Sequence, residues 1–293
     1  MDRVADDVGL GEGDVNAAAL KLARLLLPPP LGTALPRMNL VPPMNAAEAW
    51  IGGSRSNDGG YTWSGFYLPG APASFYGEGA PPTFSTEAPI FGLEAATDPV
   101  LAPGPCGTFY VVFVAFTRGD ESKIAVARYR DTNDFEGRDT IVYEGMTVIE
   151  SGNNAEYGYF LDKPDIEVDP FRAATAKAKP PGPAPVDECS HRVYVTYSTF
   201  NGLTKEEKVQ TKMNFAVAEM SGDSEMAFST TKINKTFNQN QGSAIAVDPR
   251  PGTPGDTGGG TIYVFWRHFF DPDAMIFTKS TTYGSRWTAP EII

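Results

Sequence analysis

The chain has 293 residues, of which 41% are hydrophobic and 12% aromatic, so it can bury a substantial core and is not a disordered chain. Its formal net charge of −12 repels phosphate backbones and anionic lipid, so neither nucleic acid nor a membrane is an expected partner. The 30 glycines and 25 prolines have no Gly-X-Y period and predict many turns. The longest apolar run, residues 109–116, is too short to span a membrane and predicts a buried strand.

Residues 1–36 are predicted to be an extension that carries one short helix. Asp14 supplies an N-cap, residues 17–27 are apolar apart from Lys21 and Arg24, and the prolines at 28–30 end the helix. The acidic start lacks the basic segment of a signal peptide, so no export signal is visible.

Three later segments, 97–103, 162–170 and 241–249, align as an internal repeat. Each is a short strand that leads through a Gly/Pro-rich loop into an apolar, β-branched strand. Those second strands are predicted at 108–116, 192–200 and 261–266, and third strands of alternating character at 123–129, 214–220 and 274–279. The segments start roughly 65–80 residues apart, which suits a unit of four strands with generous loops.

The sequence therefore predicts an all-β chain after the N-terminal helix. It contains about four units, approximately 37–95, 96–161, 162–240 and 241–293, each a four-stranded antiparallel sheet. The evidence for the first unit is limited to the segments 39–42 and 46–52, which look like the remains of a further copy.

An octet with the pattern Ser-x-Asp-x-Gly-x-Thr-Trp begins at Ser56 and predicts a closed hairpin turn. The Ser56 hydroxyl and the Asp58 carboxylate can accept hydrogen bonds from backbone N–H groups across the turn. Gly60 can supply a positive φ, and Trp63 is expected to fold back and bury its ring beside the hairpin.

A second octet near the C-terminus repeats this spacing with threonine in the aspartate position. It consists of Ser280, Thr282, Gly284 and Trp287 with the residues between them. Residues 130–135 form a third, eroded version that lacks the glycine and the tryptophan.

The two octets resemble the Asp-box, or bacterial neuraminidase repeat, of the sialidase superfamily. The segments 247–249, 262–266 and 276–280 also look like parts of one blade of that family. The resemblance covers roughly residues 37–293 and implies a β-propeller of four-stranded antiparallel blades. In that family the Asp-boxes lie in outer hairpins away from the propeller axis, and they occur in many non-hydrolytic proteins.

As an activity, the resemblance implies a retaining exo-sialidase, with three arginines on the sugar carboxylate, a tyrosine nucleophile activated by a glutamate, and an aspartate acid. The early Arg-Ile-Pro signature of the family is absent, since the nearest string, Pro36-Arg37-Met38, does not match it. Arg118 and Arg267 follow apolar strands at corresponding points of two units and are the candidates for substrate binding. The alternative for both is a solvated loop arginine.

Further polar side chains on the predicted strands are assigned structural roles. Tyr197 and Tyr263 are expected to pack in the core or between sheets, and Asp98, Asp165 and Asp248 to form hydrogen bonds at strand ends. No residue is assigned a catalytic role.

Cysteine, histidine and acidic residues give no clear metal or cofactor site. Cys106 and Cys189 each precede an apolar strand, and two free thiols are favoured over a bridge between them. His191 and His268 are expected in loops without nearby ligands, which gives no basis for a zinc site. Residues 131–139 are acidic but depart from the EF-hand spacing, so they predict a surface turn, with calcium an unsupported alternative.

Two functions remain open. The favoured one is a non-catalytic propeller that binds a glycan or protein ligand or acts as a scaffold, and the other is an exo-α-sialidase that acts on terminal sialic acid or a related acidic sugar. A sialidase ring closes with six blades, so another chain or further blades are expected to complete it. The family resemblance also suggests an extracytoplasmic location, and a β-sandwich lectin ranks last because it would lack the repeated segments.

Overall fold

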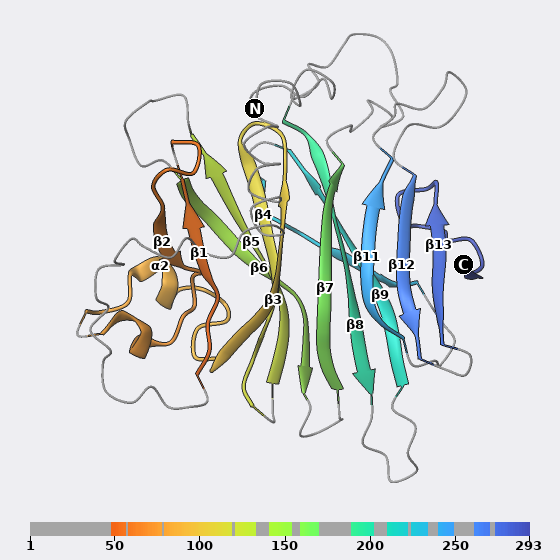
Figure 1. Cartoon of the computed structure of the whole chain (residues 1–293), viewed down its shortest axis with the longest axis horizontal. Coiled ribbons are helices and arrows are strands. Elements are labelled where there is room, and N and C mark those ends of the chain that lie inside the picture. Colours follow the sequence, from red (N-terminus) through yellow and green to blue (C-terminus); the bar gives the residue numbers. More distant parts are fainter. Residues whose placement is uncertain are drawn as a thin grey trace.

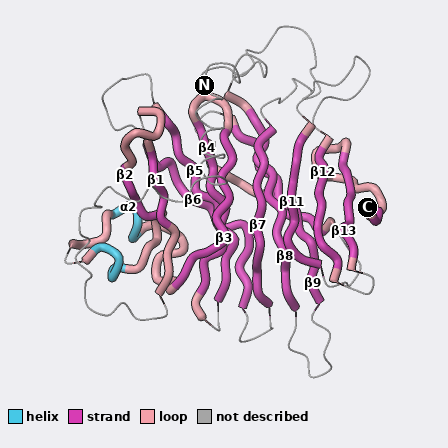
Figure 2. Tube along the Cα trace, in the orientation of Figure 1, coloured by secondary structure: helices cyan, strands magenta, loops and turns pink. Residues whose placement is uncertain are grey.

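The computed structural model describes residues 48–56, 58–77, 79–118, 121–132, 141–153, 159–169, 189–201, 210–221, 224–233, 240–248, 261–269 and 273–293. The predicted helix at 17–27 and the segment 39–42 lie outside these residues. The described chain is all-β, as predicted, apart from two short helical turns, η1 (Ala73–Tyr76) and α2 (Thr83–Thr86) (Figure 2). Neither helical turn has the length and apolarity needed to cross a bilayer.

Most of the strands form three four-stranded antiparallel sheets in which sequence neighbours pair. The first sheet contains β3 (Ala95–Pro103), β4 (Thr108–Phe116), β5 (Glu121–Asp131) and β6 (Ile141–Asn153). The second contains β7 (Tyr159–Asp169), β8 (His191–Asn201), β9 (Gln210–Met220) and β10 (Ser229–Lys232). The third contains β11 (Asn240–Val247), β12 (Ile262–His268), β13 (Ala274–Ser280) and β14 (Glu291–Ile292). A separate two-stranded sheet pairs β1 (Gly52–Arg55) with β2 (Ser64–Tyr67).

The three large sheets stack face to face, with the first strand of each at the contact (Figure 1). Strand β7 packs against both β3 and β11, so the second sheet lies between the first and the third. Hydrophobic side chains fill each space between the sheets, and a further cluster joins the first sheet to the segment around β1 and β2. Burial on both faces explains why β4 is a continuous apolar run rather than an alternating one.

Candidate functional site

The first strand of each large sheet contains a one-residue β-bulge at the same position of the repeat. The register shifts between Thr97 and Val100 in β3, between Asp162 and Asp165 in β7, and between Gln241 and Ala244 in β11. These bulges lie near the start of each first strand, at the edge where the second strand of the same sheet ends. The three aligned segments of the sequence therefore form the same local structure in three sheets.

Each bulge places one residue in the left-handed region of backbone space. The values of φ are +52° at Asp98, +50° at Lys163 and +69° at Gly242. Glycine accepts this conformation without strain, whereas a residue with a Cβ does so at a free-energy cost. Two of the three sheets therefore hold a charged residue where glycine would be easier to accommodate.

The three bulges surround one hollow of about 440 Å³ at this edge of the stacked sheets. It is lined by Asp98, Pro99, Val100, Lys163, Pro164, Asp165, Gly242 and Ser243. The Ser243 hydroxyl oxygen in its wall is buried and has no hydrogen-bond partner among the described residues. We take this hollow as the candidate functional site, because it is a concave place where three sheets bring polar side chains together.

The Lys163 ammonium group lies between two carboxylates in this hollow. Its Nζ is 2.8 Å from Oδ2 of Asp98 and 3.7 Å from Oδ1 of Asp162. The Gln241 Nε2 donates to the second oxygen of Asp162 at 3.1 Å. Burial raises the pKa of Asp162, and the neighbouring ammonium group opposes that shift. The one cation among the described residues of the lining is thus already matched by carboxylates.

Asp165 links the second sheet to the third by accepting hydrogen bonds from backbone N–H groups. One comes from Ile166 on its own strand at 3.0 Å, and the other from Ile245 on β11 at 2.9 Å. These bonds occupy both carboxylate oxygens, so Asp165 acts as the kind of hydrogen-bonding residue that was expected of it rather than as a free acid.

The two candidate arginines belong to different sheets, and neither lines the hollow. Arg118 follows β4 in the first sheet, where its backbone N–H donates to Glu94 at 3.1 Å. Arg267 lies within β12 in the third sheet, and its exposed guanidinium group makes a bidentate ion pair with Asp273. Neither arginine is therefore among the described residues that line the hollow.

Two tyrosines share one glutamate at the boundary of the first and second sheets. The hydroxyls of Tyr159 on β7 and Tyr197 on β8 both donate to the carboxylate of Glu150 on β6. Burial raises the pKa of Tyr159 to about 12, and it raises that of Tyr197 further. Tyr197 is fully buried in the core, as expected of it, and the hydrogen bonds of this cluster link the two sheets.

The first octet closes the β1–β2 hairpin by the expected hydrogen bonds. The Ser56 hydroxyl accepts from the Gly60 N–H at 2.7 Å, and Asp58 accepts from the Thr62 N–H at 2.8 Å. The bonds from Thr62 and Ser56 lower the pKa of Asp58 to about 2. The expected burial of Trp63 is wrong, because its ring is 50% exposed, although its indole N–H donates to Gly60 at 3.0 Å. The hydrogen bonds of the octet close the turn, but no described neighbour covers the Trp63 ring fully.

The second octet closes the turn between β13 and β14, the third and fourth strands of the third sheet. The Ser280 hydroxyl accepts from the Gly284 N–H at 3.0 Å, and the Thr282 hydroxyl accepts from the Arg286 N–H at 2.9 Å. Trp287 is partly buried here and packs edge-on against Phe215 of the second sheet, with ring centroids 5.0 Å apart. The third, eroded octet begins at the end of β5, and its residues 133–135 lie outside the described chain.

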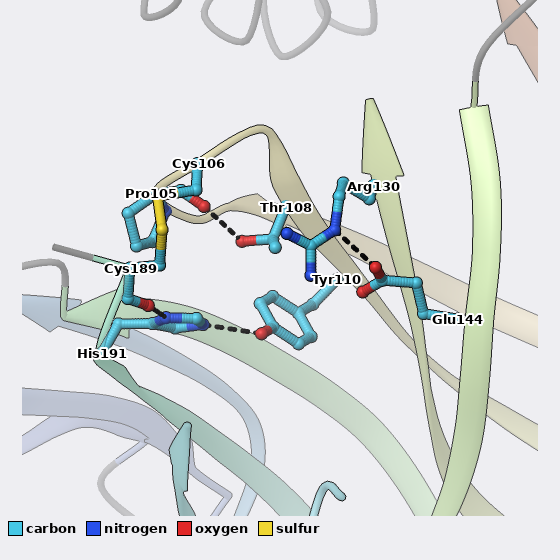
Figure 3. The surroundings of a disulfide bond; sticks show 8 residues. All are labelled: Pro105, Cys106, Thr108, Tyr110, Arg130, Glu144, Cys189 and His191. Atoms are coloured by element: carbon cyan, nitrogen blue, oxygen red, sulfur yellow. Dashed lines mark hydrogen bonds and ion pairs between the residues drawn. A yellow bond between two sulfur atoms is a disulfide. The ribbon is translucent and has the colours of Figure 1, made fainter. Parts of the chain in front are cut away.

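A disulfide joins the first and second sheets (Figure 3). It lies at the end of β3, whereas the bulge is near the start of that strand. Cys106 lies in the β3–β4 turn and Cys189 just before β8, with their Cα atoms 5.6 Å apart. The expectation of two free thiols is wrong, because residues 83 positions apart in the sequence meet across two sheets. The expectation of loop histidines is also wrong, since His191 begins β8 and His268 ends β12.

His191 is buried beside this disulfide and forms a hydrogen bond with each of its two ring nitrogens. Its Nδ1 lies 2.7 Å from the carbonyl oxygen of Cys189, which can only accept, so Nδ1 carries the proton and donates. In the neutral imidazole its Nε2 then accepts from the Tyr110 hydroxyl at 2.6 Å (Figure 3). Burial raises the pKa of Tyr110 to about 12, which keeps the donor protonated. The histidine is thus a structural residue that the sequence did not reveal.

Within the described residues, no group of three His, Cys, Asp or Glu side chains is arranged to hold a metal ion. Most of the acidic segment 131–139, the candidate for calcium, lies outside those residues.

No protein-family model matches the sequence, and no curated protein matches it either. A functional proposal must therefore rest on the sequence and the geometry.

Proposed function

We propose that the chain is a sialidase-like β-propeller module that binds a ligand and does not hydrolyse sialic acid. Three meander sheets stacked with their first strands in contact support the propeller, because blades around an axis are arranged in this way. The position of the second octet, between third and fourth strands, suggests that β1 and β2 are the corresponding strands of a preceding unit. The described units then form part of a ring.

The observation that carries the non-catalytic function is the charge of the hollow. Among the described residues no arginine lines it, and the one lysine that does already pairs with the carboxylates of Asp98 and Asp162. A sialic acid carboxylate needs positive charge, and planar guanidinium forks suit it best. The hollow therefore suits the hydroxyl or amide groups of a neutral glycan or of a protein loop better than an anionic sugar.

The Cys106–Cys189 disulfide supports the extracytoplasmic location suggested by the family resemblance. Structural disulfides persist in oxidising compartments and are rare in reducing ones. Secreted or surface-exposed glycans and proteins are then the ligands that the module would meet.

Hydrolysis of a fluorogenic α-sialoside between about pH 4 and 8 tests the non-catalytic part of the proposal. We expect no release of fluorophore above a buffer blank. Turnover that rises in proportion to protein concentration would instead support the exo-sialidase.

Binding to an immobilised panel of neutral and sialylated glycans tests the ligand site. We expect any retained glycan to be neutral, and binding to be lost in Lys163→Met, which removes the ammonium group from the hollow. Lys123→Met is the matched control, because Lys123 pairs with Glu121 outside the hollow. Equal loss in both variants would argue against the hollow, and binding of a protein but of no glycan would identify the ligand as a protein.

A further inference from the structure

The Asp98–Lys163 ion pair connects the first and second sheets at the wall of the hollow. Asp98 belongs to β3 and Lys163 to β7, and both residues line the hollow. Their side chains are 30% and 44% exposed, so a ligand can reach both charged groups. The pair thus presents a hydrogen-bond donor and an acceptor side by side at the site to which the proposed function assigns a ligand.

Neither partner of this ion pair uses its full hydrogen-bonding capacity within the described chain. An ammonium group has three N–H donors, and the described contacts of Lys163 Nζ are Asp98 Oδ2 at 2.8 Å and, farther away, Asp162 Oδ1 at 3.7 Å. A carboxylate has about four acceptor positions. Besides Lys163, the described partner of Asp98 is the Thr97 hydroxyl, which donates to it over a long 3.4 Å. The pair therefore keeps at least one donor and one acceptor for a ligand.

The backbone holds both charged residues in a fixed position. Each occupies the left-handed position of its bulge, with φ of +52° at Asp98 and +50° at Lys163. Pro99 and Pro164 follow them directly, and a proline ring fixes φ at its own position. Groups that are already ordered bind a ligand with a smaller loss of conformational freedom.

The lining next to the ion pair is largely apolar. Pro99 and Val100 continue β3 after Asp98, and Pro164 follows Lys163 on β7. Sites for small ligands combine apolar walls with a few fixed polar groups in this way. A pyranose ring is complementary to such a site, because it has apolar C–H groups on its faces and hydroxyl groups around its edge.

We propose that the Asp98–Lys163 pair recognises two adjacent hydroxyl groups of a neutral pyranose sugar. This inference rests on the proposed function and names the ligand class of the same hollow. One hydroxyl donates to the Asp98 carboxylate, and its neighbour accepts from the Lys163 ammonium group. The two charged atoms are 2.8 Å apart, and adjacent hydroxyl oxygens in a gauche arrangement are similarly spaced, so one diol contacts both. Hydrogen bonds to charged groups are also stronger than those between neutral groups.

Charge distinguishes a diol from the other groups that could enter the hollow. The carboxylate of an acidic sugar would lie beside Asp98 and Asp165, which also line the hollow, and not only beside Lys163. An apolar side chain of a protein would remove water from the ion pair and offer no hydrogen bond in return. A diol replaces that water at both charged groups and leaves the charge of the hollow unchanged.

Saturation-transfer NMR titration of the wild-type chain with neutral methyl glycosides tests the inference from the side of the ligand. The probes are methyl β-galactopyranoside, methyl β-glucopyranoside and methyl α-mannopyranoside, followed by every monodeoxy derivative of the glycoside that binds. We expect at least one parent glycoside to bind. Removal of either hydroxyl of one adjacent pair should weaken its binding about tenfold, and removal of any other hydroxyl should have a smaller effect.

Asp98→Asn and Lys163→Met test the same contacts from the side of the protein. Asparagine accepts positive φ as aspartate does, and circular dichroism and thermal unfolding establish that each variant is folded. Each variant should bind the parent glycoside about tenfold more weakly and should no longer respond to loss of the hydroxyl that the removed group contacted. Asp273→Asn and Lys123→Met are the matched controls, because they remove the same groups from ion pairs outside the hollow.

Losses that are coupled in this way, with both control variants binding like the wild type, support the inference. It is overturned if no methyl glycoside binds, if the deoxy derivatives bind as tightly as their parent, or if the control variants lose as much affinity as the hollow variants. Binding that needs Lys163 but neither adjacent hydroxyl would overturn the diol and leave the hollow as the ligand site. Hydrolysis of the α-sialoside would instead overturn the proposed function, so the two failures are distinguishable.

Discussion

Removal of the Cys106–Cys189 bridge should strongly destabilise the chain. The bridge joins the β3–β4 turn to the start of β8 and closes a sequence separation of 83 residues. In the chain-entropy treatment, opening a loop of that length in the unfolded state costs about 4.5 kcal/mol of stability at 25 °C. The double variant Cys106→Ser, Cys189→Ser should therefore lose up to that amount, since the neighbouring contacts of His191 involve backbone and tyrosine oxygens that remain.

Equilibrium unfolding in urea, followed by the fluorescence of the buried Trp266, measures this loss. With a denaturant dependence of about 3 kcal/mol/M, the midpoint should fall by roughly 1.5 M. Wild-type protein treated with a reductant is the control, and its midpoint should match that of the double variant. A mismatch would assign the effect to the serines rather than to the open loop.

Thiol titration in denaturant tests the premise itself. No reactive thiol should appear before reduction, and Cys106 and Cys189 should both react after it. Reactive thiols in unreduced protein, or a loss of stability below about 1 kcal/mol in the double variant, would refute the reasoning.

The two octets allow further tests. Gly284 has φ +84°, and an added Cβ would meet the Phe215 ring at 2.1 Å, so Gly284→Ala should lose about 3 kcal/mol of stability in urea unfolding. Gly60 has φ +94°, but a Cβ there would meet only the Trp63 ring at an ordinary contact distance of 3.7 Å, so Gly60→Ala should lose only about 1 kcal/mol. Equal losses would contradict the predicted clash. Asp58 has a folded pKa of about 2, below its ordinary 3.8, because Thr62 donates to it, so its contribution to stability is present above about pH 4 and is lost as pH falls through 2. An NMR titration of the Asp58 carboxyl carbon should give a midpoint near 2, and a midpoint near 3.8 would show that the clasp does not form in solution.

The strand pattern could be predicted from the sequence because it depends on local properties. Alternating and continuous apolar runs predicted β4, β8 and β12 within one or two residues, and these strands are confirmed. The side-chain hydrogen bonds of the two octets were predictable for the same reason, since they join residues no more than four positions apart.

Contacts between distant residues were not predictable in this way. The Cys106–Cys189 bridge and the Tyr110–His191 hydrogen bond join different sheets, so no local pattern indicates them. The burial of Trp63 was predicted wrongly for the same reason, because it depends on what lies beside the hairpin and not on the octet itself. A lysine in a turn-rich segment likewise gave no sign that Lys163 would bridge two sheets.

The bulges show how one repeated backbone feature can carry different side chains in its copies. All three first strands need a residue at positive φ, and Gly242 meets that need without strain. Asp98 and Lys163 hold the same conformation at a cost of order 1–3 kcal/mol each. Their 2.8 Å ion pair is partly exposed and stabilises the fold by only about 0.5–1 kcal/mol, so stability alone does not favour these residues over glycine. The backbone strain that the ion pair does not offset is consistent with the proposed role of the charged pair in ligand binding at the hollow. Substitution of Lys163 is therefore the informative test of ligand binding.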